Sequence, residues 1–493
     1  MIKVEKFNEV YVRVFTDRSI DQELSDFFRF RVKGYQYMPT YKNKLWDGYA
    51  RLYNLQTKTL YVGLVDYLID FAKRNNYEIE VSSELKQAQN ISYEEVKTFV
   101  YGLTLTARGK PIELRDYQIE AVQVALDRGR TLLVSPTASG KSAIIYASLR
   151  WHLNNNRKCI IIVPSTSLVE QLYSDFQDYS SNNGFEVNDY CQKLYSGFTK
   201  DISKRVLITT WQSIFKQPKG WFRQFDVVYT DEAHLAKATS LTGIMEKMDE
   251  TVYRIGTTGT LDDSHVNKLT LEGLFGRVYQ VTTTRQLMDQ NSVAELKIKC
   301  IVLKYDEPTR KMFKGTEYQK ELDWLITNTG RNKFIRNLAI STTGNTLILF
   351  NYVDKHGKIL FEIIRNKVGE DRKVFFIHGG VDTADREEIR NIVTKHNDAI
   401  IVASFGTLST GTNIPSIRNV IFAHPSKSKI RNLQSIGRGL RLDDGKDGCT
   451  LFDLCDDLHW KSWKNTTLNH AIERYKIYAT EQFKMKIIEV EMK

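Results

Sequence analysis

The sequence has few cysteines, few prolines and no long apolar segment. Its 493 residues include five cysteines and eight prolines, and no two cysteines form a C-x-x-C pair of the kind that binds zinc. The odd cysteine number argues against a disulfide framework and indicates a reducing compartment. No apolar run approaches ~18 residues, and the first residues show no signal-peptide core, so we expect a cytoplasmic protein with no membrane partner.

The charge balance is basic. Lys and Arg number 70 against 59 for Asp and Glu, which gives a net charge of +11, while the apolar fraction of 42% is ordinary for a globular protein. A basic excess favours a polyanionic partner such as nucleic acid. The alternative is a basic surface with its charges scattered and no such partner.

The pattern of apolar runs divides the chain into three parts. Residues 1–95 mix strand-like and helix-like runs, which predicts a small α+β domain. Continuous apolar runs then follow, and such runs are typical of parallel strands buried on both faces. We therefore predict an α/β protein with two doubly wound parallel-sheet domains, residues 96–290 and 291–493, the second ending in a C-terminal helix. The runs lie at residues 131–134, 159–163, 206–209 and 226–229, and again at 346–350, 373–377, 399–403 and 419–423.

A phosphate-binding loop is predicted between the first of these strands and the helix that follows it. The string SPTASGKS at residues 135–142 would direct backbone N–H groups and a helix N-terminus at an anion. Lys141 would reach the β- and γ-phosphates of a nucleotide, and Ser142 would bind Mg²⁺. The alternative is an ordinary strand-to-helix turn, since Ser135 stands where such loops usually begin with Gly. The predicted nucleotide contacts are Thr137, Ala138, Ser139, Gly140, Lys141 and Ser142.

Two adjacent carboxylates, Asp231 and Glu232, end the apolar run that starts at residue 226. We expect Asp231 to hold Mg²⁺ and Glu232 to orient or deprotonate the attacking water. Neighbouring carboxylates repel each other unless a cation lies close to them. The alternative is a solvated acidic loop.

Further segments occur in a fixed order around these two motifs. They lie at residues 114–118, 163–171, 208–213, 258–260, 404–415 and 434–441. As an ordered set, over roughly residues 112–455, they resemble the superfamily 2 helicases with a DEAH-type box. The whole chain, including its N-terminal part, is similar to phage recombination and repair helicases.

The resemblance implies two RecA-like motor domains and assigns further residues to the ATP site. Tyr117 and Gln118 would contact the adenine, and Gly411 would contact the nucleotide from the second domain. Gln434, Arg438 and Arg441 would complete the catalytic set. The two arginines are three residues apart and follow a segment with helical pattern (residues 429–435), so helical spacing would bring them to one face, from which they would reach the γ-phosphate when the domains close.

Strand contacts are expected from small hydroxyl side chains, which bind phosphate without reading bases. The candidates are Thr166, Thr210, Ser404 and Thr410. The alternative is that these residues cap helices or form turns.

Residues 27–53 combine nine aromatic side chains with six basic residues and one acid. Cations displace counterions from phosphates and rings stack on unpaired bases, so this mixture suits nucleic acid. Alternatively, most of the rings form the core of a small domain. We predict phosphate contacts from Arg29, Arg31, Lys42 and Lys44.

Together these features predict an ATP- and Mg²⁺-dependent DNA helicase or translocase. The resemblance implies 3′→5′ movement and the unwinding or remodelling of forks and junctions in recombination, replication and repair. The expected partners are DNA and RNA–DNA hybrids, the expected state is a monomer, and the expected location is the host cytoplasm if a phage encodes the chain. The alternatives are a duplex DNA translocase without strand separation, an RNA-directed helicase and an ATP-switched binding module without turnover.

Overall fold

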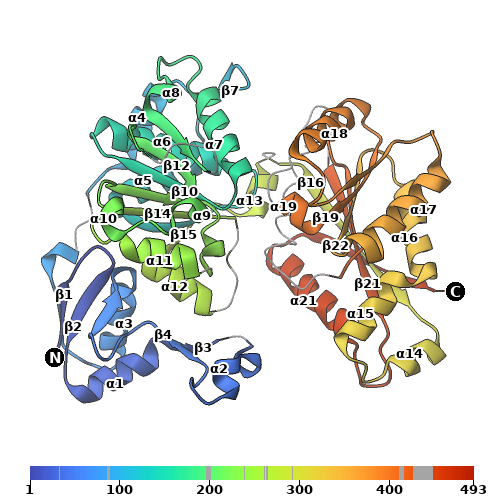
Figure 1. The fold of residues 1–493 in the computed structure, drawn as a ribbon, viewed down its shortest axis with the longest axis horizontal. Helices are drawn as coiled ribbons and strands as arrows, with labels where there is room; N and C mark the ends of the chain where they lie inside the picture. Colours follow the sequence, from blue (N-terminus) through green and yellow to red (C-terminus); the bar gives the residue numbers. More distant parts are fainter. Residues whose placement is uncertain are drawn as a thin grey trace. The chain divides into compact units, whose positions relative to one another are not determined.

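The computed structural model describes residues 1–32, 34–85, 89–195, 201–237, 239–259, 261, 265–290, 293–409, 416–425 and 448–492 (Figure 1). The chain divides into two compact units. The first contains residues 1–135 and 140–281, and the second contains residues 282–493 together with residues 136–139.

The first unit begins with a small four-stranded sheet in the order β5-β2-β1-β6. In β1 and β2, buried isoleucine and valine residues alternate with more exposed residues, as expected for a sheet with one face on a core. The predicted α+β character of this part is confirmed. Its elements are β1 (Ile2–Lys6), β2 (Tyr11–Phe15), α1 (Arg18–Phe27), β3 (Arg29–Arg31), η1 (Tyr35–Tyr37), α2 (Pro39–Lys42), β4 (Tyr49–Arg51), β5 (Thr59–Tyr61), η2 (Val62–Leu64), α3 (Val65–Arg74), β6 (Ile79–Val81) and η3 (Ser83–Leu85).

A seven-stranded parallel sheet in the order β11-β12-β10-β13-β14-β9-β15 follows in this unit. Its central strands are buried along their whole length, which explains their continuous apolar sequences. All four runs predicted before residue 290 are strands. The elements are α4 (Tyr93–Gly102), β7 (Thr106–Ala107), β8 (Lys110–Pro111), α5 (Asp116–Arg128), β9 (Arg130–Val134), α6 (Lys141–Asn154), β10 (Cys159–Val163), α7 (Thr166–Tyr179), α8 (Val187–Tyr190), β11 (Cys191–Leu194), β12 (Val206–Thr210), α9 (Trp211–Ile214), α10 (Lys219–Phe222), β13 (Val227–Thr230), η4 (Ala233–Lys237), α11 (Thr239–Lys247), β14 (Tyr253–Thr258), α12 (His265–Phe275) and β15 (Val278–Gln280).

The small sheet and the parallel sheet share one hydrophobic core. Buried Val4 of the small sheet and Leu68 of α3 belong to the same cluster as Leu132 on β9 and Ala233 beside the acidic pair. The continuous core fixes the small sheet to helices that follow the functional loops, so these parts form one packed body.

A buried arginine joins the two helices at this junction. The guanidinium of Arg254, on β14, donates hydrogen bonds to the carbonyl oxygens of Met245 (2.6 Å) and Met248 (2.9 Å) at the end of α11, and of Leu274 (3.0 Å) in the last turn of α12. A cation is favourable at helix C-termini because their carbonyls have no intrahelical partner.

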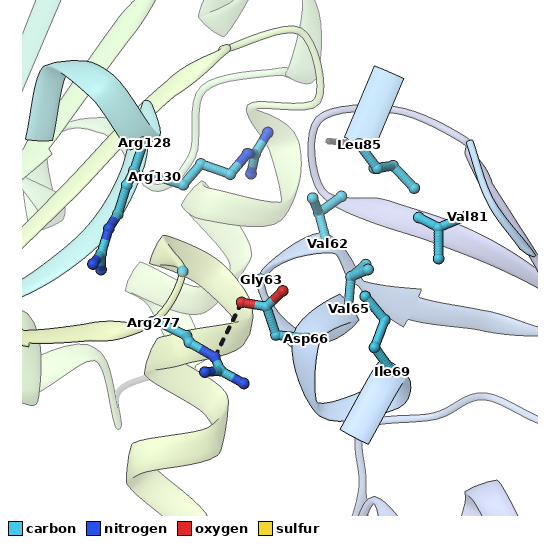
Figure 2. A pocket seen from close by; sticks show the side chains of 11 residues that line it. Val62, Gly63, Val65, Asp66, Ile69, Val81, Leu85, Arg128, Arg130 and Arg277 are labelled. Atoms are coloured by element: carbon cyan, nitrogen blue, oxygen red, sulfur yellow. Dashed lines mark ion pairs between the residues drawn. The ribbon is translucent and has the colours of Figure 1, made fainter. Parts of the chain in front are cut away.

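A groove of about 600 Å³ lies between the small sheet and the parallel sheet (Figure 2). Arg128, Arg130 and Arg277 line one wall, and Arg277 pairs with Asp66 of the other wall at 3.0 Å. Arg130 begins β9 and Arg277 precedes β15, so the groove lies at the edge where the parallel strands start. The predicted nucleotide site lies at the opposite edge.

The second unit contains another seven-stranded parallel sheet, in the order β18-β19-β17-β20-β21-β16-β22. The predicted fold class, two parallel-sheet domains after a small α+β domain, is confirmed. No helix of the described residues is long and apolar enough to cross a bilayer. The elements are α13 (Thr284–Asp289), β16 (Glu295–Lys304), α14 (Glu307–Phe313), α15 (Tyr318–Thr327), α16 (Thr329–Ser341), β17 (Thr346–Phe350), η5 (Val353–Gly357), α17 (Lys358–Val368), β18 (Val374–Ile377), α18 (Thr383–His396), β19 (Ile400–Ser404), α19 (Phe405–Ser409), β20 (Asn419–Phe422), β21 (Gly448–Asp457), α21 (Thr466–Thr480) and β22 (Lys484–Glu491).

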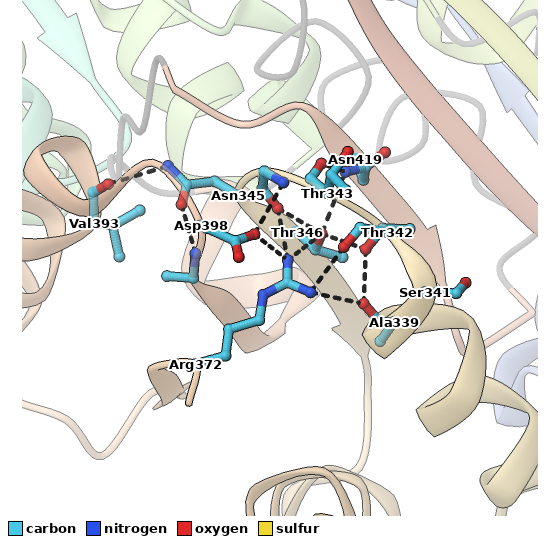
Figure 3. Close-up of polar contacts among 12 residues, drawn as sticks. Ala339, Ser341, Thr342, Thr343, Asn345, Thr346, Arg372, Val393, Asp398 and Asn419 are labelled. Atoms are coloured by element: carbon cyan, nitrogen blue, oxygen red, sulfur yellow. Dashed lines mark hydrogen bonds and ion pairs between the residues drawn. The ribbon is translucent and has the colours of Figure 1, made fainter. Parts of the chain in front are cut away.

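A polar network fixes the starts of four strands in this sheet (Figure 3). Arg372, just before β18, donates to the carbonyls of Thr342 (2.8 Å) and Gly344 (2.7 Å) and pairs with Asp398 (2.9 Å). The amide of Asn345 accepts from the N–H of Ala399 (2.8 Å), just before β19. These bonds satisfy backbone groups that would otherwise be left unpaired where the strands begin.

The chain was predicted to end in a helix, but in the structure it ends in a strand. The predicted helix is present as α21, but the alternating residues after it form an edge strand, β22, parallel to β16. The helix is anchored by a buried ion pair between Arg474 and Asp453 at 2.7 Å. The tail therefore completes the second parallel sheet.

Candidate functional site

The predicted phosphate loop connects β9 to α6. Its first residue, Ser135, donates its backbone N–H to the carbonyl of Thr258 on the neighbouring strand at 2.8 Å. Ala138 (φ 68°) and Gly140 (φ 82°) have left-handed backbones, so the chain turns sharply before the helix begins at Lys141. The ammonium of Lys141 donates back to the carbonyl of Ser135 at 3.2 Å. This leaves the N-terminus of a 14-residue helix at the loop, as an anion site requires.

The hydroxyl side chains of the loop have defined partners. Ser139 is buried and its hydroxyl donates to the carbonyl of Pro136 at 2.6 Å, so it braces the turn. Thr137 is half-buried. The hydroxyl of Ser142 lies 2.8 Å from the hydroxyl of Tyr179 at the end of α7. A contact across 37 positions of sequence could not be predicted from the motif.

Gln118 packs against the loop from α5. Its side-chain carbonyl accepts the backbone N–H of Arg115 at 2.8 Å, as in a capping box, and Gln118 is buried. A Cβ atom added to Gly140 would lie 2.2 Å from the Gln118 Nε2 atom, so that side chain would have to move, and the left-handed backbone at Gly140 (φ 82°) also favours glycine. The hydroxyl of Tyr117 accepts from Arg115 at 3.1 Å. The segment expected to read adenine is thus adjacent to the phosphate loop.

The acidic pair follows β13. The backbone N–H of Asp231 donates to Ile162 at 3.0 Å, and one carboxylate oxygen of Asp231 accepts from the hydroxyl of Thr257 (2.7 Å) and from the N–H of Glu232 (2.9 Å). Burial, and next the charge of Glu232, raise the pKa of Asp231, while Lys141 acts in the opposite direction. An ionised Asp231 therefore needs nearby positive charge.

The coupling segment at the end of β14 contacts both parts of the acidic box. The ring Nδ1 of His234 lies 2.9 Å from the hydroxyl of Thr258 and 3.2 Å from a carboxylate oxygen of Glu232. Thr257, which was not predicted, bonds to Asp231, and only its position beside the predicted segment could have indicated this role. A Cβ atom on Gly259 would lie 3.4 Å from the Lys141 ammonium, so the segment also faces the phosphate loop.

The oxygen atoms of Ser142 and Asp231 suit a hard cation such as Mg²⁺. Among the described residues, no cluster of three or more His, Cys, Asp or Glu side chains could hold a metal. Magnesium usually binds one or two protein oxygens together with substrate phosphates and water.

The predicted strand contacts lie at the ends of parallel strands. Thr166 is exposed at the first turn of α7, after β10, and Thr210 ends the adjacent β12. Thr210 is buried and its hydroxyl lies 2.9 Å from that of Ser213. Ser404, also buried, ends β19 and its hydroxyl accepts the N–H of Thr407 at 3.2 Å. To bind a phosphate, the hydroxyls of Thr210 and Ser404 would have to give up these hydrogen bonds for bonds to the phosphate oxygens.

Five predicted residues lie outside the described residues: Thr410, Gly411, Gln434, Arg438 and Arg441. Their expected roles remain predictions. Thr260, in the predicted coupling segment, also lies outside them.

The predicted basic residues of the N-terminal part lie on β3 and beyond it. Arg29 stacks on the ring of Tyr49 at 4.8 Å and pairs with Asp26 at 2.8 Å. Arg31 lies over the rings of Tyr35 (4.8 Å) and Tyr49 (5.0 Å). Lys42 and Lys44 are exposed in the segment that joins β3 to β4. Of the nine aromatic residues in this region, Phe28, Phe30 and Tyr53 are buried in the core.

Three family models match successive parts of the chain. The model described as DNA helicase UvsW, N-terminal, matches residues 1–82. The type III restriction enzyme, res subunit, model matches residues 111–263, and the helicase conserved C-terminal domain model matches residues 330–443. The three matches follow the order of the small sheet and the two parallel sheets.

Individual relatives agree with these matches. The chain is 34% identical over 500 residues to the ATP-dependent DNA helicase uvsW of Enterobacteria phage T4, covering 98% of both chains. The crystal structure of T4 UvsW matches with a TM-score of 0.54 and 31% identity over 99% of both chains. The DNA 3'-5' translocase XPB2 of Sulfurisphaera tokodaii is 23% identical over 68% of this chain and 80% of its own length.

Proposed function

The chain belongs to the superfamily 2 helicases, in the family of phage T4 UvsW, and from this premise we propose that it uses ATP to unwind or remodel branched DNA. It is a nucleic-acid-dependent ATPase. The branched substrates, forks and junctions of recombination, replication and repair, follow from its likeness to phage recombination and repair helicases. We further propose that it acts as a monomer, moves 3′→5′ on DNA and also accepts RNA–DNA hybrids.

The observation that carries this proposal is the contact between the acidic pair and the coupling segment. Thr257 bonds to Asp231 at 2.7 Å, and Thr258 lies 2.9 Å from His234, while Lys141 faces the same segment. Groups that we propose to contact the γ-phosphate are thereby tied to the end of β14. A change at the nucleotide can therefore shift the helix that follows, α12, which packs on the small sheet.

The roles of the residues follow from their chemistry. Lys141 and the N-terminus of α6 would bind the nucleotide phosphates, and Ser142 and Asp231 would hold the metal. Bound Mg²⁺ would neutralise charge on the β- and γ-phosphates. Glu232, held beside His234, would take a proton from the attacking water. Arg438 and Arg441 are proposed to stabilise the transferring phosphoryl group from the second unit.

The direct test is steady-state ATP hydrolysis with and without matched DNA and RNA strands and forks. DNA should stimulate hydrolysis, and Lys141→Ala should reduce it by about 10²–10³-fold, because a preorganised charge on the phosphates is lost. Hydrolysis unaffected by DNA would contradict the proposal. Stimulation by RNA alone would favour the RNA-directed alternative.

The N-terminal bases are proposed to hold DNA phosphates. The double variant Lys42→Glu plus Lys44→Glu should weaken binding to forked DNA and leave DNA-independent hydrolysis intact, since both lysines are exposed and distant in sequence from the ATP site. Binding measured at fixed salt should fall at least several-fold. Unchanged binding would remove these residues from the DNA contacts.

A duplex translocase without strand separation is a second candidate. It is favoured by the match of residues 111–263 to a restriction-enzyme subunit and by the likeness to a DNA translocase. Release of a triplex-forming strand without unwinding of a fork would support it. Release of a strand from a fork would support the helicase.

A further inference from the structure

The segment between β3 and β4 forms a compact projection, here called the tip (residues 34–48). Figure 1 shows the β3–β4 pair leading from the small sheet to α2. Gly34 (φ 75°) and Gly48 (φ 82°) turn the chain at its two ends. A Cβ atom on Gly48 would lie 2.6 Å from the ring of Tyr35, so the base of the tip is closely packed.

The end of α2 departs from the usual way in which a helix stops. The N–H of Lys44 donates to the carbonyl of Tyr41 (3.0 Å) and that of Leu45 to Thr40 (2.9 Å), which is a Schellman motif. Glycine usually occupies the left-handed position, but here it is Lys44, with φ 56°. The next residue usually packs its apolar side chain back onto the helix, whereas Leu45 is 79% exposed.

A cavity of about 570 Å³ opens beside this turn. Its apolar wall is made of Leu45 and the half-buried rings of Tyr41 and Trp46. The indole N–H of Trp46 donates to the carbonyl of Tyr49 at 2.8 Å, which holds that ring in place. The cavity is a shallow depression that is largely open to solvent.

The charged residues of the cavity wall favour an anion. Neither Lys42 nor Lys44 forms an ion pair with any residue that the structure describes. The one carboxylate, Asp47, forms an ion pair with Arg51, which also holds the pKa of Asp47 low, at about 2. Its charge is therefore matched inside the protein, and the positive charge of the two lysines is available to a ligand.

We propose that the cavity of the tip binds one unpaired nucleotide of a DNA strand, with the base against Tyr41, Leu45 and Trp46 and the phosphates near Lys42 and Lys44. The proposal rests on the proposed function, action on branched DNA, and names the feature of that DNA that the tip would bind. A paired base has its faces covered by its neighbours, so only an unpaired base can enter. Stacking on aromatic rings changes affinity by about 5- to 150-fold per base. The tip thereby recognises the point where a duplex opens.

The test uses the full-length chain and a forked DNA that carries a single 5-iodouracil. The base is placed in turn at unpaired positions of the fork and at a paired position in the arm, and ultraviolet cross-links are mapped by mass spectrometry. We expect cross-links within residues 34–48 from an unpaired base and none from the paired one. Cross-links that never fall in the tip, or that form equally from the paired base, would overturn the proposal.

A matched pair of leucine variants tests the cavity by DNA binding and controls for any general effect of truncating an exposed leucine on folding. Leu45→Ala should weaken binding of a single-stranded oligonucleotide by at least 3-fold relative to a duplex, whereas Leu55→Ala, which truncates another exposed leucine outside the tip, should change neither. Equal effects of the two variants would contradict the proposal. DNA-stimulated ATP hydrolysis by the wild type is measured alongside, so that a failure of the proposed function can be told from a failure of the nucleotide site. Stimulation by DNA without cross-links in the tip would refute only the proposed nucleotide site.

Discussion

The hydrogen bond from Thr257 to Asp231 offers a sharp test of the site. Thr257→Val keeps the shape of the side chain and removes the hydroxyl, which lies 2.7 Å from the carboxylate. A hydrogen bond to a charged group contributes about 1.5–3 kcal/mol, so the variant should need about 10- to 150-fold more Mg²⁺ for half-maximal hydrolysis. The matched control is Thr251→Val, because that hydroxyl is also buried but bonds to the neutral carbonyl of Phe225 (2.9 Å).

The pH profile gives the same test a second readout. Burial, and then the charge of Glu232, raise the pKa of Asp231, while Thr257 acts to lower it. Metal binding needs the ionised carboxylate, so activity should fall as the pH drops through the raised pKa. Thr257→Val removes the lowering contribution and should move this acidic limb to higher pH, whereas Thr251→Val should leave it in place. An unchanged limb and an unchanged Mg²⁺ requirement would refute the role given to the coupling segment.

Two further predictions concern packing and the loop. Arg254→Met removes three hydrogen bonds to carbonyls of α11 and α12 and should lower the free energy of unfolding by about 3–5 kcal/mol. This loss should lower the melting temperature by about 10 °C. An unchanged melting temperature would contradict the anchoring role of Arg254. Gly140→Ala would place a Cβ atom 2.2 Å from Gln118 and should abolish binding of a fluorescent ATP analogue. Gly184→Ala is its control, because Gly184 has a similar φ of 70° and open space around it, so equal loss in both variants would argue against a specific clash.

Much of the fold could be predicted because burial dictates the sequence of a central parallel strand. The runs at Cys159–Val163 and Val206–Thr210 are continuous and apolar because both faces of the sheet are covered. The alternation of charged and apolar residues in β22 is typical of a strand, so the prediction was wrong where it extended the closing helix over this segment. The shared core of the small sheet and the first parallel sheet could not be predicted, since it depends on contacts between distant segments.

The roles of the site residues remain predictions, but the positions of three of them can be compared with the structure. Motif spacing located Lys141, Asp231 and Glu232 because phosphate and metal chemistry demand those residue types at strand ends. Spacing carries no information on how side chains meet across the sheet. The bond from Thr257 to Asp231 and the contact of Ser142 with Tyr179 therefore became visible only in three dimensions.

The most direct measurement of the central claim is release of a labelled strand from forked DNA in a single turnover. The wild-type chain should release the strand only with hydrolysable ATP and Mg²⁺, and Glu232→Gln should bind the fork but release nothing. Equal release by Glu232→Gln, or release by the wild type without ATP, would contradict the account of an ATP-driven helicase.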